Sequence, residues 1–270
     1  MSSLHALRRG NRRYSLNEYG GDTNITDLYK MYGSSLALWW RGYDLANYIQ
    51  GQKIITWTGY AGSQYTSQFY WSQGTLANQG TFSTASFGGM PSMDCSTTEY
   101  DLNTNYGFSA NKWVFMCLCK YYTLANQTIV AGPYYGNGQM GIGIANNGTT
   151  ITAWAYPNGQ ASYTTSPIIA PRNNVTKLIT FGMIDGAFKA YDGLFPFSMT
   201  YSDSQPYIMR FNSLAESIGN TSTYFSGSIA EVVLLSANNN PSFNGITSLE
   251  LQNIYYNYYK KVYIADQTFA

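Results

Sequence analysis

Carboxylate side chains are the first place to look for chemistry, because glycoside hydrolysis needs two of them. The pair is set roughly 5–10 Å apart across the bond that is cleaved. On a strand such a pair takes positions i and i+2, and Glu99 and Asp101 are the pair with this spacing. They lie in Ser96–Leu102, which we interpret as a loop rather than a central strand. The sequence therefore predicts that the protein is not an enzyme, and glycoside hydrolysis is the third of three functional hypotheses.

Other catalytic and metal-binding patterns lack their residues. The chain has a single histidine, His5, which argues against a catalytic triad in the folded part. Two Asp-Gly pairs, Asp185–Gly186 and Asp192–Gly193, are typical of turns, and the aspartates follow no EF-hand pattern. The cysteines have neither a disulfide framework nor a zinc spacing, so we expect them in the core: Cys95, Cys117 and Cys119. We predict no cofactor and no metal site, and calcium held by loop oxygens is the open alternative.

Aromatic loops are the candidates for sugar binding, which needs exposed rings beside amide and hydroxyl groups. Gly132–Gly138 and Trp154–Gly159 have this composition, and Phe69–Trp71 is a third aromatic cluster. The same residues would also suit subunit contacts or packing beneath loops. The candidates for contact with a glycan or a partner protein are Tyr134, Tyr135, Asn137, Trp154, Tyr156 and Trp71.

The overall composition favours a neutral protein surface. The 270 residues include 26 tyrosines, 11% of them are charged, and the formal net charge is +1. Average soluble proteins have about 25% charged residues. We expect no nucleic-acid partner for so neutral a chain. No apolar run is long enough to span a membrane, and Met1–Arg9 lacks the apolar core of a signal peptide.

Residues 1–33 have the composition of an arm that precedes the folded part. Four arginines fall within six residues, and such a cluster can reach phosphates or an acidic neighbour. A solvated tail is the alternative. We predict that this arm anchors the protein to a partner, and that Thr26–Tyr32 forms a turn of helix before Gly33. The anchoring candidates are Arg8, Arg9, Arg12 and Arg13.

Short runs of alternating polarity, separated by Gly, Asn and Pro, predict strands from residue 34 onward. Trp113–Tyr121 is largely apolar on both faces, so we expect it at the centre of a sheet, covered on both sides. Asn146–Gly148 is typical of a hairpin turn. We expect strands at 35–41, 53–58, 91–95, 112–122, 127–132, 139–145, 149–155, 175–184, 187–191, 207–211 and 224–236.

One helix is expected, over residues 248–260. Thr247 and Glu250 have the spacing of a capping box. The helix should bury one apolar face, because its large side chains recur every three or four residues. These residues are Leu251, Ile254, Tyr255, Tyr258 and Val262.

The segment Tyr224–Ser236 contains a Phe-x-Gly-x-Ile-Ala-Glu motif and precedes this helix. Leu36–Leu45, Lys53–Trp57 and Gly88–Cys95 add weaker motifs in the same order. Together they resemble the concanavalin A-like, or laminin-G-like, jelly-roll domains. The resemblance implies an antiparallel β-sandwich with a terminal helix, in which Glu231 accepts hydrogen bonds from the backbone or from tyrosine. The chain departs from the pattern at Thr58–Ser63, where the family has a Gly- and Asn-rich turn.

These observations predict two parts, an N-terminal arm over residues 1–33 and a sandwich over 34–270. The leading hypothesis is a non-catalytic virion protein, most simply a decoration or fibre protein of a tailed bacteriophage. Its arm would bind other virion or capsid proteins, and its lectin-like sandwich would contact the particle surface or host glycans. We expect a homo-oligomer on a virion. The alternative is a free-standing carbohydrate-binding module, either cytoplasmic or exported without a visible signal.

Overall fold

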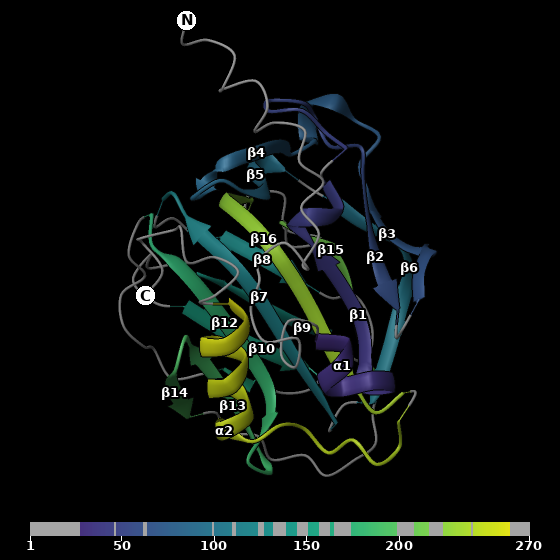
Figure 1. Ribbon diagram of the computed structural model, residues 1–270, viewed down its shortest axis with the longest axis vertical. Coiled ribbons are helices and arrows are strands. Elements are labelled where there is room, and N and C mark those ends of the chain that lie inside the picture. Colours follow the sequence, from purple (N-terminus) through teal and green to yellow (C-terminus); the bar gives the residue numbers. More distant parts are fainter. Residues whose placement is uncertain are drawn as a thin grey trace, which may run out of the picture.

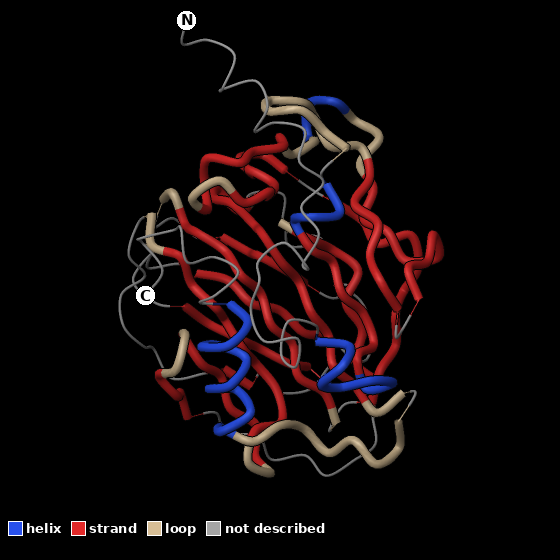
Figure 2. Tube along the Cα trace, viewed as in Figure 1, coloured by secondary structure: helices blue, strands red, loops and turns tan. Residues whose placement is uncertain are grey.

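The protein folds into a mostly antiparallel sheet that bends into two layers, with short helices against one of them (Figures 1 and 2). This confirms the predicted class, an all-β sandwich of the concanavalin A-like, jelly-roll kind with a C-terminal helix. The computed structural model describes residues 28–45, 47–61, 64–98, 100–109, 112–123, 127–131, 139–144, 151–156, 163–164, 174–198, 208–215, 224–238 and 240–259.

The strands of the near layer in Figure 1 follow one another by pairing. In that order they are β2 (Thr56–Ala61), β1 (Leu36–Arg41), β16 (Phe225–Ser236), β7 (Trp113–Tyr121), β12 (Thr176–Ile184), β13 (Ala187–Asp192) and β14 (Phe195–Ser198). From β2 the path continues into the far layer through β3 (Gln64–Ser72), β6 (Tyr100–Ser109), β15 (Ile208–Leu214), β8 (Gln127–Ala131), β9 (Gln139–Ile144), β10 (Ile151–Tyr156) and β11 (Tyr163–Thr164). The hairpin of β4 (Thr81–Phe87) and β5 (Met90–Thr98) pairs with β16.

Strand β7 lies at the centre of the near layer, between β16 and β12. All nine of its residues are buried, which confirms the prediction that both of its faces are covered. Trp113, Phe115, Cys117, Cys119 and Tyr121 belong to the inner core between the two layers. The alternate residues Val114, Met116 and Leu118 belong to an outer core beneath the helices. One strand therefore joins both cores.

Several strands extend beyond the sequence-based expectation. Ser96–Leu102 is not a loop, because β5 runs to Thr98 and β6 begins at Tyr100. Strands β3 and β4 were not expected, since their Gln-, Ser- and Thr-rich sequences lack a regular apolar alternation. Their pairing with β2, β6 and β5 supplies the missing stabilisation. The expected hairpin around Asn146–Gly148 is supported by the antiparallel pairing of β9 and β10, although the turn itself lies outside the described residues.

Short helices flank the near layer. Helix α1 (Leu28–Tyr32) is the predicted turn of helix, and its Leu28 is buried in the outer core. The contact begins within the segment that we predicted to be an arm, while residues 1–27 lie outside the described chain. Three short 3-10 helices follow along the chain, η2 (Gly33–Ser35), η3 (Gly42–Leu45) and η4 (Leu76–Asn78).

The C-terminal helix begins as α2 (Ser248–Asn253) and continues as a π-helical segment, η5 (Ile254–Tyr259). The capping box is confirmed: Thr247 Oγ1 accepts from the Glu250 backbone N–H at 3.1 Å, and Glu250 Oε2 accepts from the Thr247 N–H at 2.6 Å. The predicted apolar face is also confirmed up to Tyr258, since the four side chains are buried in the outer core: Leu251, Ile254, Tyr255 and Tyr258. The π-helical turn was not foreseen.

A buried carboxylate fixes this helix on the sheet. Glu231 is fully buried on β16, and its Oε1 accepts hydrogen bonds from Trp39 Nε1 at 2.5 Å and from the Tyr258 hydroxyl at 2.8 Å. A bulge in β16 between Ile229 and Glu231 lets Glu231 share the helix-facing side with its neighbour Ala230. The prediction that Glu231 accepts from a tyrosine is confirmed.

We expect Glu231→Ala to lower the free energy of unfolding by about 2–5 kcal/mol, because two buried donors lose their acceptor. Glu231→Gln keeps a carbonyl oxygen at this position and is the matched variant, with a smaller expected loss. Urea denaturation followed by tryptophan fluorescence measures both. Equal stability of the alanine variant and the unaltered protein would contradict this assignment.

Candidate functional site

The structure places the sequence-derived sugar-binding candidates in three different ways. Tyr134, Tyr135 and Asn137 lie outside the described residues, as do the anchoring candidates Arg8, Arg9, Arg12 and Arg13. Trp154 and Tyr156 lie on β10, where the backbone alone is described. These candidates stay predictions.

Trp71 is not a sugar-stacking residue. Its side chain is fully buried in the inner core, and its ring centroid lies 5.1 Å from that of Trp40. The interpretation of the Phe69–Trp71 cluster as an exposed platform is therefore wrong at this residue. The pattern is ambiguous in sequence because Trp40 lies on a different strand, far away along the chain.

Catalytic and metal chemistry find little support in the part of the chain that is described. Asp101 is exposed on β6, and Glu99, its predicted partner, lies outside the description. Among the described residues, no group of three or more His, Cys, Asp or Glu side chains could hold a metal ion. The three cysteines are buried as expected, and burial raises the pKa of the Cys95 and Cys117 thiols, which keeps them protonated. No helix within the described ranges is long and apolar enough to cross a membrane.

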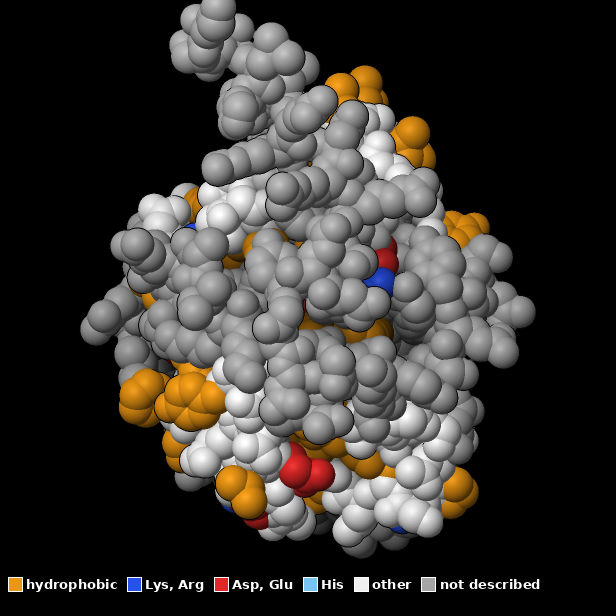
Figure 3. All heavy atoms as spheres, in the orientation of Figure 1, with side chains coloured by type: hydrophobic (Ala, Val, Ile, Leu, Met, Phe, Trp, Pro, Cys, Tyr) orange, Lys and Arg blue, Asp and Glu red, His pale blue; other side chains and the backbone are white. Residues whose placement is uncertain are grey.

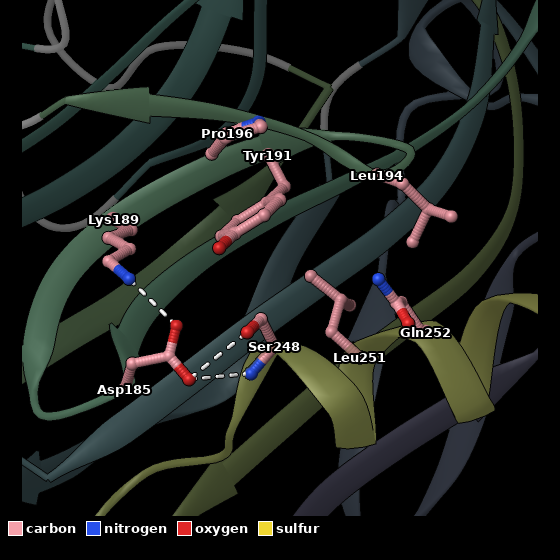
Figure 4. A pocket seen from close by; sticks show the side chains of 8 residues that line it. All are labelled: Asp185, Lys189, Tyr191, Leu194, Pro196, Ser248, Leu251 and Gln252. Atoms are coloured by element: carbon pink, nitrogen blue, oxygen red, sulfur yellow. Dashed lines mark hydrogen bonds and ion pairs between the residues drawn. The ribbon is translucent and has the colours of Figure 1, made fainter.

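A hollow of about 350 Å³ lies between the start of α2 and the hairpin strands β13 and β14 (Figure 4). We call it the Ser248 hollow. Its volume lies at the lower end of the range for small-ligand pockets, roughly 300–1,000 Å³. The residues that line it come from two distant parts of the chain: Asp185, Lys189, Tyr191, Leu194, Pro196, Ser248, Leu251 and Gln252.

A tight turn positions the charged end of this hollow. Asp185 and Gly186 connect β12 to β13 and both have positive φ angles, 52° and 73°, as a two-residue type I′ hairpin requires. The predicted Asp-Gly turn is confirmed. Glycine meets the requirement at 186 without strain, and aspartate is among the residues that tolerate it at 185.

The carboxylate of Asp185 is held from two sides. Its Oδ1 accepts from the Ser248 N–H at 2.8 Å and from the Ser248 hydroxyl at 3.2 Å, and its Oδ2 accepts from Lys189 Nζ at 2.7 Å (Figure 4). The Lys189 hydrogen bond, followed by those from Ser248, lowers the pKa of Asp185, and the same ion pair raises the pKa of Lys189. Both groups are therefore charged at neutral pH. The sequence placed Asp185 in a turn and gave no signal of its partner Ser248.

The other groups in the hollow are not committed to the protein. Neither the Tyr191 hydroxyl nor the Gln252 amide has a hydrogen-bond partner among the residues drawn in Figure 4. Burial raises the pKa of Tyr191, so its phenol stays protonated and can donate. Leu194, Leu251 and Pro196 form an apolar wall beside these polar groups.

Large apolar side chains are exposed near the hollow. On α2 and η5, Leu249 is 65% exposed and Tyr256 is 55% exposed, and Tyr256 follows Gln252 by one turn of the helix. Figure 3 shows hydrophobic side chains at the lower left, in the region of α2 and β14. An exposed ring beside an amide and hydroxyl groups is the composition that we expect of a sugar-binding surface.

A second, more polar hollow of about 290 Å³ lies along η3 and β2. Its lining residues are Asp44, Asn47, Tyr48, Gln52, Thr56 and Thr58. Much of this polarity is already satisfied: Asp44 binds Arg41 at 2.7 Å, and the Tyr48 hydroxyl donates to the Thr56 carbonyl at 3.1 Å. Its lining contains no leucine, isoleucine or proline. The Ser248 hollow is therefore the better candidate for an amphipathic ligand.

Solved structures support the fold. The chain is similar to a sialidase of Trypanosoma rangeli in complex with the inhibitor DANA, with a TM-score of 0.51 and 10% identity over 94% of this chain and 39% of that one. It is also similar to domain 4 of AbnA, a GH43 extracellular arabinanase from Geobacillus stearothermophilus, in complex with arabinotriose. That match has a TM-score of 0.49 and 12% identity over 68% of this chain and 82% of the domain.

At such identities the likeness shows the fold alone. This chain corresponds to 39% of the sialidase chain, so that protein's activity cannot be transferred to it as a whole. No protein-family model matches the sequence, and no curated protein matches it. The function must therefore be argued from the site.

Acid should weaken the contact between Asp185 and the helix. The folded-state pKa of Asp185 is lowered, so its contribution to stability is complete above the unfolded value of about 4 and is lost as the pH falls below it. Asp185→Asn keeps an acceptor for Ser248 but does not titrate. We expect the difference in melting temperature between the two proteins to shrink from pH 7 to pH 3. A difference that stays constant would refute the role of this carboxylate.

Proposed function

We propose that this protein is a non-catalytic carbohydrate-binding β-sandwich and that the sugar binds in the Ser248 hollow. One observation carries the proposal: a fixed polar end, Asp185 with Lys189 and Ser248, adjoins an apolar wall with a hydroxyl and an amide that have no partner in the hollow. Sugars combine apolar C–H faces with hydroxyl groups, so a binding site needs both kinds of surface.

Rigidity favours binding over mere exposure. The Lys189 ammonium is fixed by Asp185, and Asp185 is fixed by the first residue of α2. Preorganised groups lose less conformational entropy when a ligand binds. Tyr256, exposed one turn beyond Gln252, extends the site with an aromatic ring.

The absence of catalysis is part of this proposal. Asp185 is the one carboxylate among the described residues that line the hollow, and it is paired with Lys189. The common glycosidase mechanisms need a second carboxylate across the scissile bond. We therefore expect the sugar to leave unchanged.

A place on a virus particle stays a prediction from sequence. The fold and the Ser248 hollow are compatible with it but do not favour it over a free-standing module. The proposed anchoring arginines lie outside the described residues. Deleting residues 1–27, which precede α1, tests anchoring without removing Leu28 from the outer core.

A glycan array probed with the full chain tests the proposed function. Tyr191→Phe and Gln252→Ala each remove one hydrogen-bonding group, so we expect each to weaken retention on the bound glycan by about 2–10-fold. Asn253→Ala is the matched control, since Asn253 is exposed on the same helix and does not line the hollow.

Three results would count against this assignment. No retention on any glycan would reject carbohydrate binding. Retention that is unchanged in both variants would move the site elsewhere, and alanine at Tyr134, Tyr135 and Trp154 would then test the sequence-derived loops. Loss of binding in the Asn253 control would show a general effect on the helix.

A further inference from the structure

The Ser248 hollow offers donors rather than acceptors to a ligand. The Asp185 carboxylate already accepts three hydrogen bonds, two from Ser248 and one from Lys189. Lys189 has three N–H donors, of which Asp185 takes one. The Tyr191 hydroxyl and the two N–H groups of the Gln252 amide are further donors. A ligand that fits must therefore supply acceptor oxygens.

The hollow also has a place for a small apolar group. Leu194 and Leu251 approach each other across the hollow beside the Gln252 amide, and Pro196 lies above Tyr191 (Figure 4). A hydroxyl placed against this wall would lose its hydration without gaining a partner. A methyl group placed there would gain from leaving water.

We propose, building on the proposed carbohydrate-binding function, that the ligands are N-acetylated amino sugars. The acetamido group joins a carbonyl acceptor to a methyl group within one planar unit. Its oxygen would accept from Lys189, Tyr191 or Gln252, and its methyl would pack on Leu194 and Leu251. No other common substituent of a neutral sugar supplies both.

Two other sugar classes fit less well. Unmodified hexoses present hydroxyls, which need acceptors as well as donors, and Asp185 has spent its acceptors. Uronic acids would suit the Lys189 ammonium but would bring a charge towards Asp185 and leave the apolar wall unused. These classes are the comparison arms of the experiment.

Isothermal titration with β1,4-linked trisaccharides that differ at one substituent tests the inference. The probes are the trimers of N-acetylglucosamine, glucosamine and glucose, with the N-acetylgalactosamine and galacturonic acid series as further arms. We expect an acetylated sugar to bind about tenfold or more tightly than its matched hydroxyl or amine counterpart.

Leu194→Asn tests the apolar wall directly. Leu194 is part of the turn between β13 and β14 and is partly exposed, so the fold should tolerate this change. We expect the variant to lose the preference for the acetylated sugar. Leu249→Asn, on an exposed leucine that does not line the hollow, should keep it. Melting curves confirm that both variants fold.

The outcomes separate this inference from the proposed function. Equal binding of acetylated and unacetylated sugars, or an unchanged preference in Leu194→Asn, would overturn the inference while carbohydrate binding stands. Tighter binding of the galacturonic acid series would assign the site to acidic sugars instead. Failure of every sugar to bind would overturn the proposed function itself.

Discussion

The hydrogen bonds of a buried carboxylate, Glu231, determine much of the architecture. A carboxylate is costly to bury unless donors surround it, and its donors come from β1 through Trp39 and from the terminal helix through Tyr258. The helix is therefore tied to one place on the sheet. That place also brings Ser248, Leu251 and Gln252 against β13 and β14, where they complete the candidate site.

The terminal helix is held at both ends by carboxylates of opposite character. At its start the exposed Asp185 binds Ser248, and towards its end the buried Glu231 binds Tyr258. Between these points Leu251 and Ile254 pack into the outer core on β7 and its neighbours. A hollow with one wall on a helix that is fixed in this way is preorganised, which lowers the cost of ordering its side chains on binding.

The sequence predicted the features that depend on local patterns. The apolar β7, the capping box at Thr247 and the Asp185–Gly186 turn each follow from neighbouring residues, and each is present. The family resemblance, in turn, placed β16 and the role of Glu231. Strands β3 and β4 could not be predicted in this way, because pairing with other strands stabilises their polar sequences.

Contacts between distant residues set the limit for the site. Trp71 was interpreted as an exposed ring, since nothing near it in sequence indicates that Trp40 packs against it. The link between Asp185 and Ser248 spans 63 residues and leaves no local pattern in the sequence. The Ser248 hollow exists because the fold joins a hairpin turn to a helix start, so its residues became candidates when the topology was known.

A crystal structure of the full chain with a bound N-acetylglucosamine trisaccharide tests the central claim most directly. The account predicts the sugar in the Ser248 hollow, with hydrogen bonds from Tyr191 or Gln252 and an acetamido methyl against Leu194 and Leu251. A sugar seated along η3 and β2, or on the loops around Tyr134 and Trp154, with the Ser248 hollow empty, would contradict it.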